Sequence, residues 1–265
     1  MNSKHRIASI LKANTLTTKI TELQTFDVSE LELTTHLDFE LPTKLRLGHM
    51  VEKVVAELIK ASTNYKLLHE NIQILEEKNT IGELDFILEE IHSNKIIHLE
   101  LAYKFYLFDP SISENPFYNW IGPNRRDSLK EKLDKLKKKQ FPLLFHNATN
   151  AKLTDVKVDN VSQQLCLLAS LYIPYAYKGK IDSSFQKAVQ GYYLNFDTFI
   201  NLNHSEKTYY LPTKKEWGID PASNEIWTGF EEIQKEIYNQ LQQNHAPLCW
   251  RKYKDSYASF FVVWW

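Results

Sequence analysis

Charged side chains alternate with apolar ones along residues 81–107, a pattern typical of two β-strands. Glu83 and Asp85 share one face of the first expected strand, while Glu100 and Lys104 share one face of the second. Carboxylate oxygens are the preferred protein ligands of a hard cation such as Mg²⁺. Because a buried charge is costly unless it is paired or metal-bound, the pattern predicts either a metal site or the solvated face of an antiparallel hairpin.

The elements that would position these side chains can be read from the flanking sequence. Residues 45–60 carry apolar side chains at helical spacing, which predicts a helix with Glu52 at the edge of its apolar stripe. Residues 65–74 read as a strand, and a polar turn at 92–95 joins the two strands of the hairpin. The predicted order is helix, strand, strand, strand. Glu52 is then either a third carboxylate of the same site or a surface-edge residue.

A basic segment follows the hairpin. Residues 125–139 contain eight basic and three acidic residues, and residues 127–140 have the apolar spacing of an amphipathic helix. Such a segment is either an ordinary solvated helix face or a surface that contacts the phosphate backbone of a nucleic acid. The residues expected to contact the nucleic acid are the basic Arg125, Arg126, Lys130 and Lys137, together with Gln140 at the end of this segment.

Composition excludes several classes of protein. The 265 residues are 43% hydrophobic and 13% aromatic, which allows a substantial core, and their net charge is -1. No GxGxxG or GxxxxGK[ST] sequence is present, which argues against the common nucleotide-binding classes. Two cysteines, the absence of a secretory signal and the lack of an apolar run of roughly 20 residues predict a cytoplasmic protein without a membrane span.

The rest of the chain gives weaker patterns. Residues 141–145 could form a short strand, and residues 156–172 have a mixed start followed by a helix-like run. Residues 229–243 predict a helix, and the last segment predicts two short strands around residues 254–255. Because no linker is evident, we expect a single domain over residues 1–265, with a core at about residues 40–150 and an elaboration at about 151–265.

The order of the acidic residues resembles the PD-(D/E)XK nuclease superfamily. The matching residues are Glu52 on the helix, the GELD sequence that ends at Asp85, and Glu100 followed by Lys104. More closely, residues 40–265 resemble the bacterial family of unknown function DUF1853, which sequence comparison has placed in that superfamily. This resemblance rests on the segments RLGHMVE, GELDFIL, HLELAYKFYL, WIGPNRRDSLKEKL and GYYLNF.

The resemblance implies an α/β fold with a restriction-endonuclease-like core, in which helices flank a central mixed sheet. It also implies hydrolysis of DNA phosphodiester bonds with Mg²⁺ or Mn²⁺. Asp85 and Glu100 would hold the metal and Glu52 would complete its shell. Gln140 would be a supporting polar group, as a helix glutamine is in exonuclease-like relatives.

One position departs from the superfamily pattern. The lysine usually stands two residues after the acid, where this chain has Ala102. Lys104 lies two residues further along the same strand face, a displacement of about 7 Å that a lysine side chain could span. The resemblance therefore implies that Lys104 orients or deprotonates the attacking water, or stabilises charge in the transition state.

Alternatives to catalysis remain at this stage. The fold could have lost cleavage and kept only nucleic-acid binding, or it could bind a protein partner. His98, two residues before Glu100, could contact the metal or could be structural. Trp120, Trp217 and Trp227 could stack on bases or pack within the protein.

Overall fold

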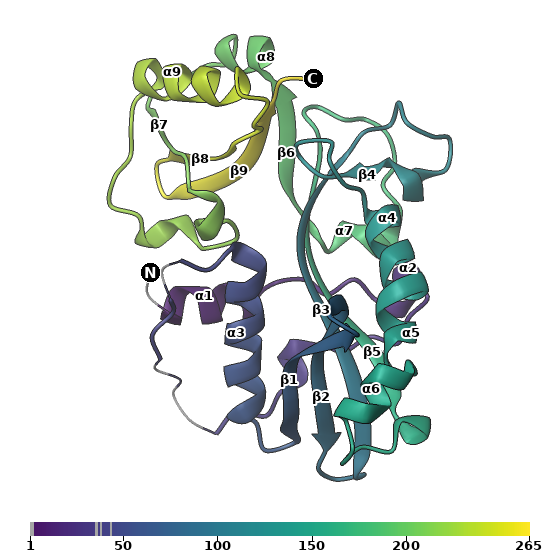
Figure 1. Cartoon of the computed structure of the whole chain (residues 1–265). Helices are drawn as coiled ribbons and strands as arrows, with labels where there is room; N and C mark the ends of the chain where they lie inside the picture. The colour runs from purple at the N-terminus through teal and green to yellow at the C-terminus, as the bar shows by residue number, and fades with distance from the viewer. Residues whose placement is uncertain (1–2, 35–36, 38, 43) are drawn as a thin grey trace. The chain divides into compact units, whose positions relative to one another are not determined.

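The computed structural model describes residues 3–34, 37, 39–42 and 44–265 (Figure 1). The strands among these residues are β1 (Tyr65–Glu76), β2 (Asn79–Glu90), β3 (Lys95–Phe108), β4 (Trp120–Ile121), β5 (Ser162–Pro174), β6 (Val189–Asn195), β7 (Lys207–Tyr210), β8 (Leu248–Tyr253) and β9 (Ser256–Val263). These nine strands of the described residues form a mixed sheet in the order β1-β2-β3-β5-β6-β9-β8-β7, and β4 pairs with β3. The predicted fold class, a mixed α/β protein with a central sheet and flanking helices, is therefore confirmed.

The helices of the described residues vary greatly in length. They are α1 (Ser3–Leu11), α2 (Thr18–Thr21), α3 (Leu47–Lys60), α4 (Leu129–Lys135), the π-helical turn η3 (Leu136–Gln140), α5 (Phe141–Leu143), α6 (Asn147–Lys152), α7 (Ser183–Gln186), α8 (Phe196–Ile200) and α9 (Phe230–Leu241). Short 3-10 turns are η1 (Val28–Glu30), η2 (Pro116–Asn119), η4 (Val158–Asn160), η5 (Lys214–Glu216) and η6 (Pro221–Ser223). Within the described part of the chain, none of the helices combines the length and apolar character needed to cross a membrane.

The chain divides into two compact units that are not continuous in sequence. The first consists of residues 1–103 and 131–169, and the second of residues 104–130 and 170–265. Strands β3 and β5 each contribute residues to both units.

Helix α3 is the main helix of the first unit and lies along strand β1 (Figure 1). The apolar side chains that repeat at helical spacing, Val51, Val54, Val55, Leu58 and Ile59, are fully buried. Burial of one stripe of side chains is the force that fixes such a helix on a sheet. The predicted helix is confirmed, and it carries Glu52 on its partly buried side.

The predicted hairpin is also confirmed, since β2 and β3 pair in antiparallel fashion. Both of its faces are covered. Phe86 and Ile87, which point to opposite faces of β2, are each 0% exposed. On β3, His98 and Glu100 are 0% and 1% exposed. The alternative of a solvated face is therefore wrong for His98 and Glu100, whereas Glu83, Asp85 and Lys104 are half-buried.

Two segments differ from the sequence prediction. Residues 156–172, expected to have a mixed start followed by a helical run, instead contain most of strand β5, whose centre is buried on both faces. A strand of this kind carries a nearly continuous apolar run, which periodicity alone cannot distinguish from a buried helix. Residues 141–145, expected as a short strand, instead continue the preceding helix as α5, with Pro142 in its first turn where proline is tolerated.

The second unit is built on the C-terminal strands. Strand β9 pairs in parallel with β6 and antiparallel with β8, and β8 pairs with β7. The predicted helix at 229–243 is confirmed as α9, and the two predicted terminal strands are confirmed as β8 and β9. The buried core cluster here contains Leu194, Phe199, Tyr209, Ile233, Ile237, Leu241, Cys249, Phe260 and Val262.

Candidate functional site

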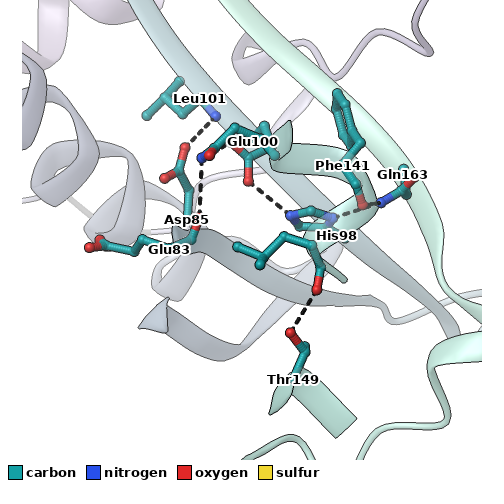
Figure 2. A network of polar contacts seen from close by, with 10 residues as sticks. Glu83, Asp85, His98, Glu100, Leu101, Phe141, Thr149 and Gln163 are labelled. Atoms are coloured by element: carbon teal, nitrogen blue, oxygen red, sulfur yellow. Dashed lines mark hydrogen bonds and ion pairs between the residues drawn. The ribbon is translucent and has the colours of Figure 1, made fainter. Parts of the chain in front are cut away.

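Asp85 and Glu100 lie at the point where the pairing of β2 and β3 ends. The register runs from Glu90↔Lys95 to Phe86↔Leu99, so Asp85 and Glu100 occupy the next position on each strand. The carboxylate oxygen Oδ2 of Asp85 accepts a hydrogen bond from the backbone N–H of Leu101 at 2.8 Å (Figure 2). The two acidic side chains predicted to share a site are thus brought together.

The electrostatics of Asp85 confirm this crowding of negative charge. Burial raises the pKa of Asp85 well above its ordinary value, and the charges of Glu100 and Glu52 raise it further. The Leu101 N–H and the positive charge of Lys132 act in the opposite direction but do not outweigh these effects. The site therefore favours a proton or another cation beside Asp85.

The imidazole ring of His98 contacts the carboxylate of Glu100. Its Nε2 atom lies 3.0 Å from Oε1 of Glu100. The side-chain amide nitrogen of Gln163 lies 3.0 Å from His98 Nδ1 and donates to the carbonyl oxygen of Phe141 at 2.7 Å (Figure 2). Because that carbonyl can only accept, the amide nitrogen faces Nδ1 as a donor, so Nδ1 accepts and the proton is on Nε2. His98 is thus a neutral donor to Glu100 and does not balance its charge.

Gln140 reaches the same carboxylate from the basic helix. Its amide nitrogen donates to the carbonyl oxygen of Glu83 at 3.2 Å and lies 3.4 Å from Oε2 of Glu100. It is the last residue of the π-helical turn η3, a type of turn often found at functional sites. The structure therefore places Gln140 as a polar neighbour of Glu100, while Glu83 contributes its backbone carbonyl to this contact.

Glu52 approaches from helix α3. Its charge acts on Asp85, and its Oε2 atom lies 2.9 Å from Nδ1 of His49 on the same helix. Over the described residues, no group of three or more His, Cys, Asp or Glu side chains is gathered closely enough to hold a metal ion. Glu52 is thus near the two strand carboxylates without joining them in a ready-made ligand set.

The donors that are present still suit a hard divalent cation. Asp85 and Glu100 supply two carboxylates in a buried setting where their charges are only partly balanced. Mg²⁺ is commonly held by one or two protein carboxylates, with water and substrate phosphate completing its shell. The pair fits Mg²⁺ or Mn²⁺ better than Zn²⁺, because nitrogen and sulfur ligands are the ones that zinc prefers.

Lys104 and the carboxylates fall in different units. Lys104 belongs to the second unit, where its Nζ atom donates to Oδ2 of Asp127 at 2.6 Å. Asp85 and Glu100 belong to the first. Lys104 is thus engaged by an aspartate of its own unit.

Lys132 is a residue that the sequence reasoning missed. It is half-buried, and its charge acts on Asp85 within the first unit. On helix α4 it follows buried Leu129 by three residues and precedes buried Leu136 by four, so it lies beside the inward stripe of the helix. The spacing of Lys132 is visible in the sequence, but the resemblance to the nuclease superfamily points to a lysine on the strand.

The residues predicted to contact nucleic acid are divided between the two units. Arg125, Arg126 and Lys130 belong to the second unit, and Lys137 and Gln140 to the first. Arg125 pairs with Asp109 at 2.9 Å. Lys137 pairs with an exposed glutamate, Glu22, at 2.5 Å.

Other side chains of the second unit take part in packing. Arg125 lies 4.5 Å from the ring of Trp265. Trp120 and Trp217 are 1% and 7% exposed, which makes them packing residues.

The family of the chain follows from comparison with known proteins. The model of a family described as "Domain of unknown function (DUF1853)" matches residues 2–258. Neither the curated proteins nor the solved structures include a match to the chain. Because the family model covers almost the whole sequence, the chain belongs to the DUF1853 family.

Proposed function

We propose that this protein is a Mg²⁺-dependent nuclease that hydrolyses DNA phosphodiester bonds on a restriction-endonuclease-like core. The observation that carries the proposal is the pair formed by half-buried Asp85 and fully buried Glu100 at the end of the β2–β3 pairing. The order of Glu52, Asp85 and Glu100 along helix and strands, which resembles the PD-(D/E)XK superfamily, also supports it.

Each residue has a definite task in this proposal. Asp85 and Glu100 would hold Mg²⁺ or Mn²⁺, and Glu52 would contact it through water. The bound metal would supply an activated water and a Lewis acid for the scissile phosphate. His98 donates to Glu100 and fixes its orientation, while Gln140 keeps the basic helix against the same carboxylate.

The lysine of the site is proposed to be Lys132. Ala102 stands where the superfamily lysine is usual, and Lys104 is bound to Asp127. Lys132 acts on Asp85 from the helix that also carries Gln140. Its ammonium group would orient the attacking water or donate to a phosphoryl oxygen as negative charge develops there. Lys104, the lysine favoured by sequence, is the alternative for this role.

DNA in the cytoplasm is the proposed substrate. The surplus of positive charge over residues 125–139 supports a contact with the phosphate backbone. Arg126, which is exposed, and Lys130 are the proposed contacts beside Arg125 and Lys137.

The test is a cleavage assay with purified protein, Mg²⁺ or Mn²⁺, and single-stranded, duplex and branched DNA. We expect cleavage that is lost in Asp85→Asn and in Glu100→Gln. Glu89→Gln is the matched control, because Glu89 lies on the same strand as Asp85 and pairs with exposed Lys66 at 3.8 Å. No cleavage of any substrate, together with no Mn²⁺ binding by calorimetry, would rule the proposal out.

A second candidate is a catalytically inactive member of the same fold that binds nucleic acid or a protein partner. Ala102 at the usual lysine position and the absence of a three-residue ligand group in the described residues favour it. It predicts salt-dependent DNA binding that survives Asp85→Asn and Glu100→Gln and that needs no divalent metal. A protein-binding role predicts no DNA affinity even at low salt.

A further inference from the structure

A pocket lined by aromatic and basic side chains lies in the second unit, whereas the carboxylates belong to the first. The pocket has a volume of about 160 Å³ and lies between β6, β7, β8, β9 and the segment after α8. Aromatic rings form most of its wall: Tyr175, Tyr192, Phe199, Tyr209 and Phe260. This volume is close to the roughly 150 Å³ of a cavity that admits one benzene ring, so the pocket can take a single planar ring.

The charge of the pocket is positive. Arg251 and Lys207 line it, and no acidic side chain is among the described residues of its wall. The ammonium group of Lys207 is held by the carbonyl oxygen of Asn203 at the same wall. Two cations without a carboxylate attract an anion to this pocket.

The positive charge of Arg251 is not balanced by a neighbouring acidic side chain among the described residues. Arg251 lies at the centre of β8, half-buried, opposite Tyr209 of β7 and Ala258 of β9. Within the described part of the chain its guanidinium group makes no hydrogen bond or ion pair. Arginine is the side chain best suited to binding a phosphate or carboxylate through two parallel hydrogen bonds.

The hydroxyl group of Tyr192 is a second unsatisfied group at the pocket. It is buried and has no hydrogen-bond partner among the described residues. The ring of Tyr192 stacks on Phe260, with centroids 5.4 Å apart and planes 6° from parallel. By contrast, the hydroxyl of Tyr209 is satisfied by His204 at 2.6 Å. Buried polar groups without partners are uncommon in folded proteins and call for an explanation.

We propose that this pocket binds a nucleoside monophosphate group, with its base against the aromatic wall and its phosphate on Arg251. A neutral ring would leave Arg251 unpaired, and inorganic phosphate alone would make no use of the rings. The volume takes the base but not a whole nucleotide, so the sugar and phosphate extend toward the half-exposed Arg251. A free nucleotide and the phosphorylated end of a strand share this chemistry.

The test is isothermal titration calorimetry on the full chain carrying Asp85→Asn, which prevents turnover of nucleic-acid ligands at the proposed active site. The ligands are the four nucleoside 5′-monophosphates, inorganic phosphate, and a 5′-phosphorylated hexanucleotide beside its unphosphorylated form. We expect at least one monophosphate to bind, and the same ligand to bind at least tenfold more weakly after Arg251→Met. Tighter binding of the phosphorylated hexanucleotide than of the monophosphate would identify a strand end, and equal or weaker binding a free nucleotide.

Lys252→Met is the matched control, since Lys252 follows Arg251 on β8 and lies over the ring of Trp227, outside the pocket. It should leave the affinity unchanged. If Arg251→Met fails to fold, as judged by thermal unfolding, Lys207→Met serves instead and should weaken binding at least threefold. Absence of monophosphate binding, equal affinity for inorganic phosphate, or an affinity that the pocket variants leave unchanged would each overturn the proposal.

Discussion

The centres of the two units are stabilised in different ways. In the first, Glu100 and His98 are buried beside half-buried Asp85, and burial raises the pKa of Asp85. In the second, aromatic rings fill the core: Phe199 contacts the rings of Tyr209, Phe230 and Phe260. Rings stabilise a core through the area they bury and through their contacts with one another, whereas a buried ionisable group costs free energy of desolvation. The ionisable groups of the candidate site thus lie in the first unit, and most of the aromatic packing lies in the second.

The largest effect is expected from the aromatic core. Phe199→Ala should lower the free energy of unfolding by about 3–5 kcal/mol, because it removes a fully buried ring and leaves a cavity. Denaturant unfolding followed by circular dichroism measures this. Ile226→Ala is the control, since Ile226 is 74% exposed and its loss should change stability by no more than about 0.5 kcal/mol. Equal effects for both variants would contradict the packing described for this core.

A smaller loss is expected at the histidine of the first unit. His98→Leu should lower the free energy of unfolding by about 1–3 kcal/mol, because Glu100 and Gln163 each lose a buried hydrogen-bond partner. The double variant His98→Leu, Glu100→Met should lose less than the sum of its single variants, as a double-mutant cycle would measure. A strictly additive result would mean that the two side chains do not interact.

Asp85→Asn should act in the opposite direction. A carboxylate whose folded-state pKa is raised costs stability at neutral pH, so the neutral amide should raise the free energy of unfolding by about 1 kcal/mol in the presence of a chelator. The amide oxygen can still accept from Leu101. Thermal unfolding with and without Mg²⁺ is the measurement: Mg²⁺ should raise the Tm of the unsubstituted protein and not that of the variant. A destabilised variant would count against the crowding of negative charge.

Lys132→Met tests whether Lys132, rather than Lys104, is the lysine that acts in DNA cleavage. Removing a positive charge near Asp85 should tighten Mn²⁺ binding roughly fivefold, which is about 1 kcal/mol for partly screened charges. DNA cleavage should nevertheless be lost. Calorimetry with Mn²⁺ and the cleavage assay measure the two effects separately, and Lys104→Met is the comparison variant. Weaker Mn²⁺ binding in Lys132→Met, or full activity, would transfer the role to Lys104.

The smallest effect is expected at an ion pair of the second unit in which Arg125 is exposed and Asp109 is buried. Burial acts to raise the pKa of Asp109, but hydrogen bonds from Ser111 and Arg125 outweigh it and hold the pKa below its ordinary value. Asp109 therefore stabilises the fold above the unfolded-state pKa of about 3.9, and this contribution is lost as the pH falls through the lower folded-state pKa. Asp109→Asn should cost at most about 1 kcal/mol at pH 7, after allowance for solvent screening. Urea unfolding at pH 7 and pH 3 should show the difference shrinking at the lower pH.

The sequence was informative wherever one face of an element is polar. Helix α3, the β2–β3 hairpin and α9 were predicted because their apolar residues follow a clear period. Strand β5 was missed because both of its faces are buried and the period disappears. The meeting of Asp85 with Glu100 followed from strand alternation.

Other contacts of the site join residues far apart in the chain. Gln163 meets His98 across 65 residues, and Lys132 acts on Asp85 from a different element. No local pattern encodes either contact. The division into two units was equally hidden, because each unit combines separate stretches of chain.

The place of β9 in the sheet has a consequence for biosynthesis. All residues of the first unit have been made once residue 169 has been added, whereas β9, which lies between β6 and β8, ends at Val263. At the usual rate of translation, this strand is finished roughly 5–20 s later. During that interval β6 has no β9 to pair with, and its backbone groups are open to other chains. A nascent chain of this protein should therefore be most prone to aggregation, and most dependent on chaperones, just before β9 is complete.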